Sequence, residues 1–224
     1  MRRLGTGPLL AGVFLGTASL YFVSLAAGIP ALRVAAKPFP ALALAAWVTL
    51  RSTRLAGRLT ALGLVLSAAG DLLLETDRFL PGLVAFLAGH LAYVAAFLAA
   101  ERRPAFARAL PFLAWGLGAF SLLRPGLGDL TLPVALYVAV ICTMMWRASA
   151  RIGSPATPAL AALLGLFGAV AFGASDTLLA FDRFSAPVPA ARWAIMVLYW
   201  LGQCGLAASA VLGCDMLREK VENR

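Results

Sequence analysis

Long apolar runs, each bounded by charged residues, proline or glycine, occupy most of this 224-residue chain. Hydrophobic residues make up 62% of the sequence and charged residues 13%, whereas soluble domains have about half and about a quarter. In water, such a chain would have too few polar side chains to cover its surface. The sequence therefore predicts an integral membrane protein and disfavours a disordered chain, a coiled coil or a nucleic-acid-binding domain.

The apolar runs predict an all-α fold, a polytopic membrane bundle of about eight transmembrane helices in one integral membrane domain, residues 1–224. A helix needs roughly 20 apolar residues to cross a bilayer. The expected spans are residues 7–27, 38–50, 58–75, 79–100, 107–123, 130–147, 157–181 and 190–213. The second run is short and begins with Pro38 and Pro40, which a first helical turn tolerates, so seven spans is the alternative count.

The basic residues are distributed unevenly between the two sides of this topology. With the N-terminus inside, thirteen of the 19 Lys and Arg residues face the cytoplasm and six face outward. The inner set is Arg2, Arg3, Arg51, Arg54, Arg58, Arg102, Arg103, Arg108, Arg147, Arg151, Arg218, Lys220 and Arg224. The outer set is Arg33, Lys37, Arg78, Arg124, Arg183 and Arg192. This bias follows the positive-inside rule, so we expect a multi-pass protein of a cell membrane, the bacterial inner membrane, with both termini in the cytoplasm.

The basic residues have two further interpretations. Arg2 and Arg3 before an apolar run also fit a signal peptide, whose removal would leave seven spans. The net charge of +9 is explained by topology and by attraction to anionic lipid, so no nucleic-acid partner is expected.

An internal repeat links two segments of the chain. Residues 70–79 and 175–184 are identical at six of ten positions, including two Asp, Arg and Phe at equal spacing. Four of the six aspartates lie in these segments, which are 105 residues apart and separated by four expected spans. An even number of spans gives both copies the same direction, so the sequence predicts a parallel repeat of two four-helix halves, approximately residues 1–106 and 107–224.

The repeat places one aspartate of each copy inside the membrane. Asp71 and Asp176 precede the outer ends of their spans by one to two turns, which corresponds to a depth of roughly 6–9 Å. A lone carboxylate in hydrocarbon costs several kcal/mol, so both should face the bundle interior or a water-filled cavity. We expect two acids that face each other in a pocket open outward. The alternative is that each acid bonds neighbouring helices, as Ser67 one turn before Asp71 would allow.

Other polar residues accompany the two acids. His90 and Tyr93 lie in the span after the first copy, and Tyr199 and Gln203 lie in the span after the second. Each is a candidate substrate-binding residue, and the alternative for each is a hydrogen bond within the helix bundle.

Asp77, Arg78, Asp182 and Arg183 lie at the predicted outer mouth. They are candidates for docking a phosphate-bearing head group, because arginine matches phosphate geometry. The alternative is a solvated rim with local ion pairs.

The sequence offers no cluster of metal ligands. Cys142, Cys204 and Cys214 lie in apolar stretches without ligand spacing, and His90 is the one histidine. We therefore expect no disulfide framework, no metal and no cofactor.

Two groups of motifs carry a resemblance to a known family. The first is Gly70-Asp71-Leu-Leu-Leu followed by Gly82-Leu-Val-Ala-Phe-Leu-Ala-Gly-His90-Leu-Ala-Tyr93, and the second is Ala174-Ser175-Asp176-Thr-Leu-Leu-Ala-Phe-Asp-Arg-Phe followed by Tyr199-Trp-Leu-Gly-Gln203. Together they resemble the YhhN family, the lysoplasmalogenases, over nearly the whole chain. The resemblance implies hydrolysis of the vinyl ether bond of a lysoplasmalogen to a fatty aldehyde and glycerophosphoethanolamine or glycerophosphocholine.

The two predicted acids suit this chemistry. A vinyl ether hydrolyses when its terminal alkene carbon is protonated, and water then traps the oxocarbenium ion as a hemiacetal. One protonated carboxyl group and one carboxylate supply these steps, and glycosidases meet a similar problem with two acids. The residues leave open which aspartate donates the proton.

Two other classes of function remain open from the sequence. A small-molecule or proton-coupled transporter also uses parallel repeats and membrane acids, although the inner halves of the two acid-bearing spans are almost wholly apolar. A non-catalytic lipid-binding membrane protein would need its acids for folding rather than for turnover.

Overall fold

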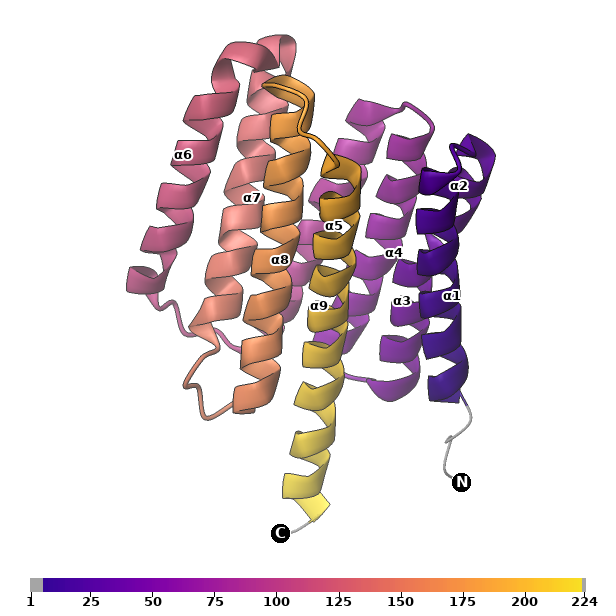
Figure 1. Ribbon diagram of the computed structural model, residues 1–224. Coiled ribbons are helices and arrows are strands. Elements are labelled where there is room, and N and C mark those ends of the chain that lie inside the picture. Colours follow the sequence, from indigo (N-terminus) through magenta and orange to yellow (C-terminus); the bar gives the residue numbers. More distant parts are fainter. Residues whose placement is uncertain (1–5, 223–224) are drawn as a thin grey trace. The chain divides into compact units, whose positions relative to one another are not determined.

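The computed structural model describes residues 6–222, with side chains described up to Cys214, and every regular element in this part is helical (Figure 1). Arg2, Arg3 and Arg224 of the predicted charge bias lie outside the described residues, as do the side chains of Arg218 and Lys220. The α-helices are α1 (Thr6–Ala26), α2 (Pro30–Ala36), α3 (Phe39–Arg51), α4 (Leu55–Glu75), α5 (Phe79–Ala100), α6 (Leu110–Leu127), α7 (Thr131–Ala150), α8 (Ala159–Phe184) and α9 (Ala191–Glu222). Two short 3₁₀ helices, η1 (Phe106–Ala109) and η2 (Gly128–Leu130), precede α6 and α7.

The predicted membrane bundle is confirmed: seven helical segments of the described residues are long and apolar enough to cross a membrane. One of them, Phe106–Ala150, is 45 residues long and contains both α6 and α7. These two helices pack against each other, since a methyl group added at Gly116 would lie 3.0 Å from Val138. The count of eight separate spans and the internal repeat stay predictions.

The second span begins earlier than the sequence indicated. Helix α2 starts at Pro30, and Pro30–Arg51 forms one apolar segment of 22 residues that is interrupted around Pro38. Arg33 therefore lies within a helix and Lys37 caps its end, whereas the sequence placed both in a loop. Pro30 fits there because proline lacks a backbone N–H, and an N–H in the first turn of a helix would have no partner within the helix.

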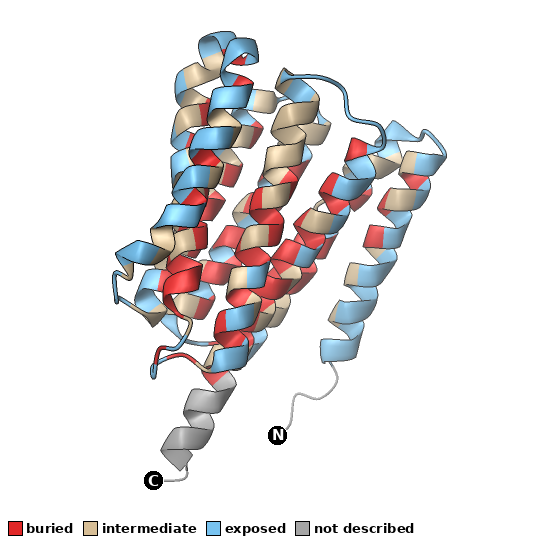
Figure 2. Ribbon diagram, turned by 60° about the vertical axis from the view of Figure 1, so that its left-hand side comes forward, coloured by how far each residue is buried: buried red, intermediate tan, exposed pale blue. Residues whose placement is uncertain are grey.

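Exposure of apolar side chains follows the membrane prediction. Buried residues follow one face of most helices, and exposed residues follow the other (Figure 2). Large apolar side chains such as Leu9, Leu117 and Leu122 are more than half exposed. Such a surface would be unfavourable in water and is favourable against lipid.

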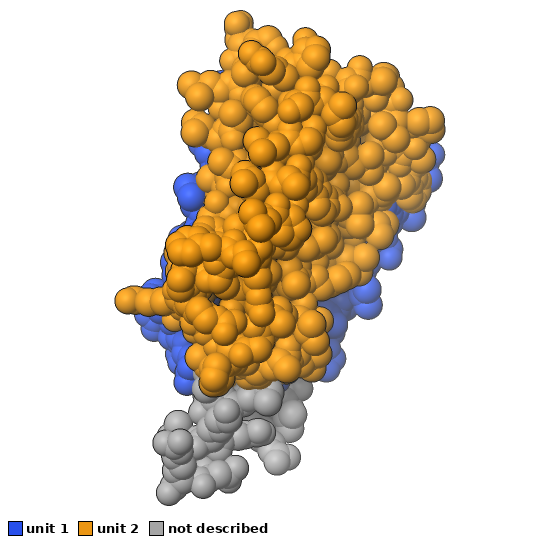
Figure 3. Space-filling view, turned by 90° about the vertical axis from the view of Figure 1, so that its left-hand side faces the viewer, with its two compact units in different colours: residues 1–96 blue, residues 97–224 orange. Residues whose placement is uncertain are grey.

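The chain consists of two compact units, Met1–Ala96 and Phe97–Arg224 (Figure 3). In the first, α3 packs against α1 and α4, and α4 packs against α5. In the second, α8 packs against α6, α7 and α9. The predicted duplication, with halves 1–106 and 107–224, stays a prediction.

Glycines bring α8 and α9 into close backbone contact. A Cβ at Gly168 would lie 2.6 Å from the Leu206 nitrogen and 2.7 Å from the Gly202 oxygen. No larger residue fits this contact without a shift of one helix, as in other small-residue helix pairs of membranes. The contact fixes the second predicted acid helix against the helix that carries Tyr199 and Gln203.

Candidate active site

Asp71 of the first unit is shielded from solvent near the end of α4. The residue is 1% exposed and lies one turn before Glu75, the last residue of the helix. Ser67, one turn earlier on the same face, is also 1% exposed, and its hydroxyl has no hydrogen-bond partner among the described residues. A buried hydroxyl and a buried carboxyl group therefore share one face of α4.

Helix α5 packs closely against this part of α4. A Cβ at Gly89 would lie 3.2 Å from the Gly63 oxygen and 3.3 Å from Ser67 Oγ, and Phe86 lies against Gly70. His90 lies four residues after Phe86 and three before Tyr93, both of which contact glycines of α4, so His90 shares their side of α5. The sequence placed His90 in the helix adjacent to Asp71, and the structure confirms that α5 packs on α4.

The His90 ring is oriented by its own helix. His90 is 1% exposed, and Nδ1 lies 2.8 Å from the Phe86 carbonyl oxygen. A carbonyl oxygen only accepts hydrogen bonds, so in the neutral ring Nδ1 carries the proton and Nε2 carries the lone pair. Tyr93, also 1% exposed, lies edge-on to this ring with 6.4 Å between centroids.

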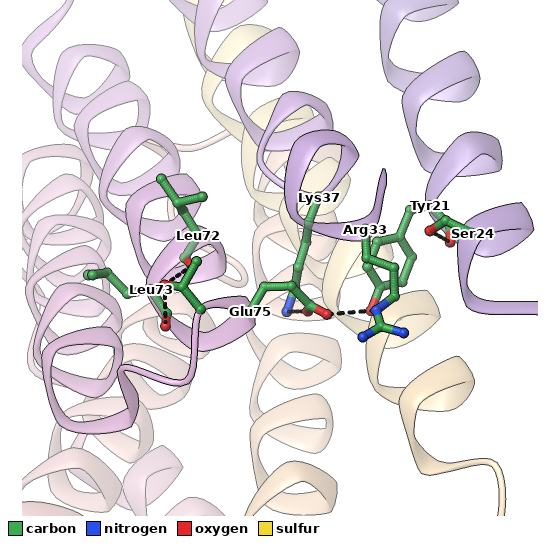
Figure 4. A network of polar contacts seen from close by, with 8 residues as sticks. Tyr21, Ser24, Arg33, Lys37, Leu72, Leu73 and Glu75 are labelled. Atoms are coloured by element: carbon green, nitrogen blue, oxygen red, sulfur yellow. Dashed lines mark hydrogen bonds and ion pairs between the residues drawn. The ribbon is translucent and has the colours of Figure 1, made fainter. Parts of the chain in front are cut away.

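The end of α4 carries an ion cluster that the sequence did not predict. Glu75 Oε1 accepts a hydrogen bond from Arg33 Nε at 2.8 Å, and Oε2 accepts one from Lys37 Nζ at 3.0 Å (Figure 4). Arg33 and Lys37 are 42 and 38 residues away in sequence, so no local pattern joined them to Glu75. Asp77 and Arg78 lie beyond the cluster, exposed in the turn to α5, where Asp77 adopts φ 58°.

Asp176 of the second unit lies at a junction of four helices. Its Oδ2 accepts a hydrogen bond of 2.6 Å from the Tyr137 hydroxyl of α7. The preceding residue, Ser175, donates to the Ile195 carbonyl of α9 at 2.9 Å, and the following residue, Thr177, accepts from Trp115 Nε1 of α6 at 3.2 Å. Three consecutive residues of α8 thus contact three different helices.

Tyr137 and Trp115 bond to Asp176 and to its neighbour Thr177, and neither residue was predicted from the sequence. They are 39 and 62 residues from their partners and lie in otherwise apolar helices. Their residue types could have indicated this contact, because a Tyr hydroxyl or a Trp N–H inside a helix bundle usually has a hydrogen-bond partner.

Tyr199 and Gln203 lie in the close contact between α8 and α9. Tyr199 is 3% exposed and meets the Phe172 ring edge-on with 5.1 Å between centroids, and Gln203, which follows Gly202 of the α8–α9 contact, is fully buried. Both predicted residues therefore belong to the interior of the second unit, together with Ser175 of the same helix pair.

The predicted outer residues of α8 have separate surroundings. Asp182 Oδ1 accepts a hydrogen bond from the Val188 N–H at 2.9 Å, which ties down the loop after the helix. Arg183 is exposed, and its guanidinium carbon lies 5.8 Å from the centroid of the Phe184 ring.

The structure groups the predicted residues by unit. Asp71, His90 and Tyr93 lie in the first unit, and Asp176, Tyr199 and Gln203 lie in the second. The expectation that the two acids face each other stays a prediction. An apolar groove of about 490 Å³ between α6 and α7 is lined by none of these residues.

Comparisons with known proteins point to one family. The chain is 35% identical over 149 residues to lysoplasmalogenase TMEM86B of Homo sapiens, which covers 66% of this chain and 61% of that protein. It is 36% identical over 168 residues to lysoplasmalogenase TMEM86A of Bos taurus, covering 72% and 67%. The chain thus spans about three fifths to two thirds of the length of these relatives. No solved structure matches it. The family model described as the YhhN family matches residues 32–210, most of the chain, and the chain therefore belongs to the YhhN family.

Proposed function

We propose that this protein hydrolyses the vinyl ether bond of a lysoplasmalogen within the membrane, releasing a fatty aldehyde and a glycerophosphoethanolamine or glycerophosphocholine head group. The relatives are named lysoplasmalogenases, which supports a hydrolase of this class with a lysophospholipid substrate. The observation that carries the proposal is that each unit holds an aspartate inside a long apolar helix with polar groups beside it. A carboxyl group inside a membrane is energetically costly, so the few that occur usually mark a functional site.

We assign the two chemical roles from the contact of Asp176, and the other role then falls to Asp71. Asp176 Oδ2 accepts the Tyr137 hydrogen, which is the role of a carboxylate oxygen, so Asp176 would stabilise the cation and orient water. Asp71 would donate a proton to the alkene carbon that does not carry oxygen, which converts the ether carbon into the carbon of an oxocarbenium ion. Water adds to that carbon and gives its proton to the Asp176 carboxylate. The hemiacetal then breaks its bond to the glycerol oxygen, which takes the proton held by Asp176, while the hemiacetal hydroxyl group gives its proton to Asp71, and the aldehyde is released with both acids restored.

The remaining predicted residues would bind the substrate. His90 offers Nε2 as an acceptor because Nδ1 donates to Phe86, and we propose that it binds a glycerol hydroxyl group. The Ser67 hydroxyl, buried without a partner among the described residues, would bind on the same side.

Tyr93 of the first unit, and Tyr199 and Gln203 of the second, would contact the substrate. The exposed Arg78 and Arg183, with Asp77 and Asp182 beside them, would form the outer rim that attracts the head group.

Product analysis in D₂O tests the proposal. The purified protein in liposomes is given lysoplasmenyl-ethanolamine, and the matched control substrate is the alkyl ether of the same chain length, which lacks the double bond. The proposal predicts aldehyde with one deuterium on the carbon next to the carbonyl group, and no turnover of the alkyl ether. Uptake of the intact lipid without cleavage by a folded protein would contradict it and support a transporter.

A further inference from the structure

The ion cluster at the end of α4 holds two cations around one carboxylate. Arg33 and Lys37 each donate to a different oxygen of Glu75, and the three side chains are between 9% and 17% exposed. Both oxygens of Glu75 are thereby occupied, and the cluster retains one net positive charge. A partly shielded cation that lacks a counter-ion attracts an anion more strongly than a solvated one does.

Arg33 keeps a donor edge for such an anion. Its Nε donates to Glu75, and neither terminal nitrogen has a hydrogen bond within the described residues. In Figure 4 these two nitrogens point away from Glu75. A guanidinium group whose Nε is held by a carboxylate presents its remaining N–H groups in a fixed direction, and phosphate oxygens match that geometry.

The position of the cluster relative to Asp71 suits a lysophospholipid. Glu75 follows Asp71 by one turn on the same face of α4, a rise of about 6 Å along the axis. In the substrate, five single bonds of about 1.5 Å separate the ether oxygen from phosphorus, which gives roughly 6 Å when extended. A head group at the cluster would thus leave the vinyl ether at the depth of Asp71.

We propose that Arg33 and Lys37 form the phosphate subsite for the glycerophospho head group, and that Glu75 is the positioning residue that holds both cations. The inference rests on the proposed function and assigns the phosphate to residues that the outer rim does not include. Position 180 of the second copy, which corresponds to Glu75, is Ala180, so the subsite belongs to the first unit alone.

The test compares two vinyl ethers that differ only in phosphate. The substrates are lysoplasmenyl-ethanolamine and the 1-alkenylglycerol with the same chain, and the variants are Arg33→Gln, Lys37→Met and Glu75→Gln. Arg58→Gln, an exposed arginine in the first turn of the same helix, is the control. We expect Arg33→Gln to raise KM for the phospholipid about 10- to 100-fold with kcat within about twofold, since a hydrogen bond to a charged group contributes about 1.5–3 kcal/mol. The KM for alkenylglycerol should not change.

Conservative replacement gives a second readout. Arg33→Lys keeps the charge and loses the planar donor edge, so it should recover part of the phospholipid KM. An equal loss on both substrates, with no recovery in Arg33→Lys, would mean that the cluster only joins α2 to α4 and would overturn the subsite.

A binding measurement separates failure of the subsite from failure of the proposed function. If the folded parent cleaves neither ether, native mass spectrometry with lysophosphatidylethanolamine and monoacylglycerol still tests the subsite. Preference of the parent for the phospholipid, reduced about tenfold in Arg33→Gln and retained in Arg58→Gln, would support it. Equal binding of both lipids by the parent would overturn it.

Discussion

Asp71 and Asp176 occupy matching positions in two similar sequence segments, yet their surroundings differ. Asp71 is almost completely buried where α4 packs on α5, and the end of its helix is held by an ion cluster. Asp176 is partly buried and bonds to Tyr137 at a point where α8 contacts three helices. Local sequence therefore placed the acids within their helices, and tertiary packing determined their partners.

The helix ends differ in the same way. Helix α4 ends at Glu75, and Asp77 adopts a positive φ that aspartate tolerates better than most residues. Helix α8 continues through the matching positions to Phe184, so Asp182 is still helical and bonds the following loop. The first copy thus ends in a short turn and an ion cluster, whereas the second ends in a longer helix and loop.

The largest expected effect concerns the two acids themselves. Asp71→Asn should lower kcat roughly 10³-fold, within the range for loss of a general acid. Asp176→Asn should lower it by a similar factor, because neutral asparagine cannot stabilise the cation. Single-turnover aldehyde release measures both, and Asp129→Asn, an exposed aspartate before α7, is the matched control. Full activity in either variant would mean that the aspartate replaced in it is not catalytic.

Removing the Tyr137 hydroxyl should affect one acid only. Tyr137→Phe leaves the ring in place and should lower kcat about 10-fold or more, because one hydrogen bond to a charged group is lost. A Tyr137→Phe change made in the Asp176→Asn background should have almost no further effect, whereas in the Asp129→Asn control background it should keep its full effect. Equal effects in both backgrounds would separate Tyr137 from Asp176.

Glycine substitutions should distinguish the packing of the two units. In the second unit, a Cβ at Gly168 meets the α9 backbone at 2.6 Å, whereas in the first a Cβ at Gly70 meets the Phe86 ring at the same distance. Because a ring moves more easily than a helix backbone, Gly168→Ala should be the more destabilising, by about 1–3 kcal/mol. Unfolding in mild detergent measures this. Gly12→Ala, with no neighbour within 4 Å, should be neutral or stabilising, and a larger loss at Gly70 than at Gly168 would refute the comparison.

The smallest expected effect is a pH dependence carried by Glu101 of the second unit. Hydrogen bonds from the Ser154 hydroxyl and the Arg103 N–H lower the pKa of Glu101 below its usual 4.5. A lowered folded-state pKa stabilises the fold above the unfolded pKa, and this contribution is lost as pH falls through the folded value. The difference in Tm between the parent and Glu101→Gln should therefore be small at pH 7 and shrink below pH 4.5. A Tm difference that grows as the pH falls below 4.5 would contradict a lowered pKa of Glu101 in the folded state.

The membrane architecture was predictable because its signal is local. Apolar runs of bilayer length, bounded by charges, indicated helices that the structure contains, including both acid-bearing ones. Asp71 lies about one turn before the end of its helix, as predicted, whereas Asp176 lies slightly more than two turns before the end of α8, because that helix continues to Phe184. These features depend on spacing along one helix, which the sequence displays directly.

The partners of the acids were not predictable, because they come from distant segments. The pairing of Glu75 with Arg33 and of Asp176 with Tyr137 depends on which helices pack together. Arg147 shows the same limit: the sequence indicated a solvated cytoplasmic charge, yet the residue is 3% exposed. Its guanidinium group donates to the carbonyl oxygens of Glu101, Arg103 and Pro104, which allows the burial.

We propose that Asp71 and Asp176 act together on one substrate, and the double variant tests this proposal most directly. Single-turnover rates of aldehyde release are compared for Asp71→Asn, Asp176→Asn and the combined variant, with folding checked by elution profile. Residues that act as a unit are strongly non-additive, so the combined loss should be about that of the more damaging single change. Losses that multiply in the double variant would show that the two aspartates act independently and would contradict their joint action on one substrate.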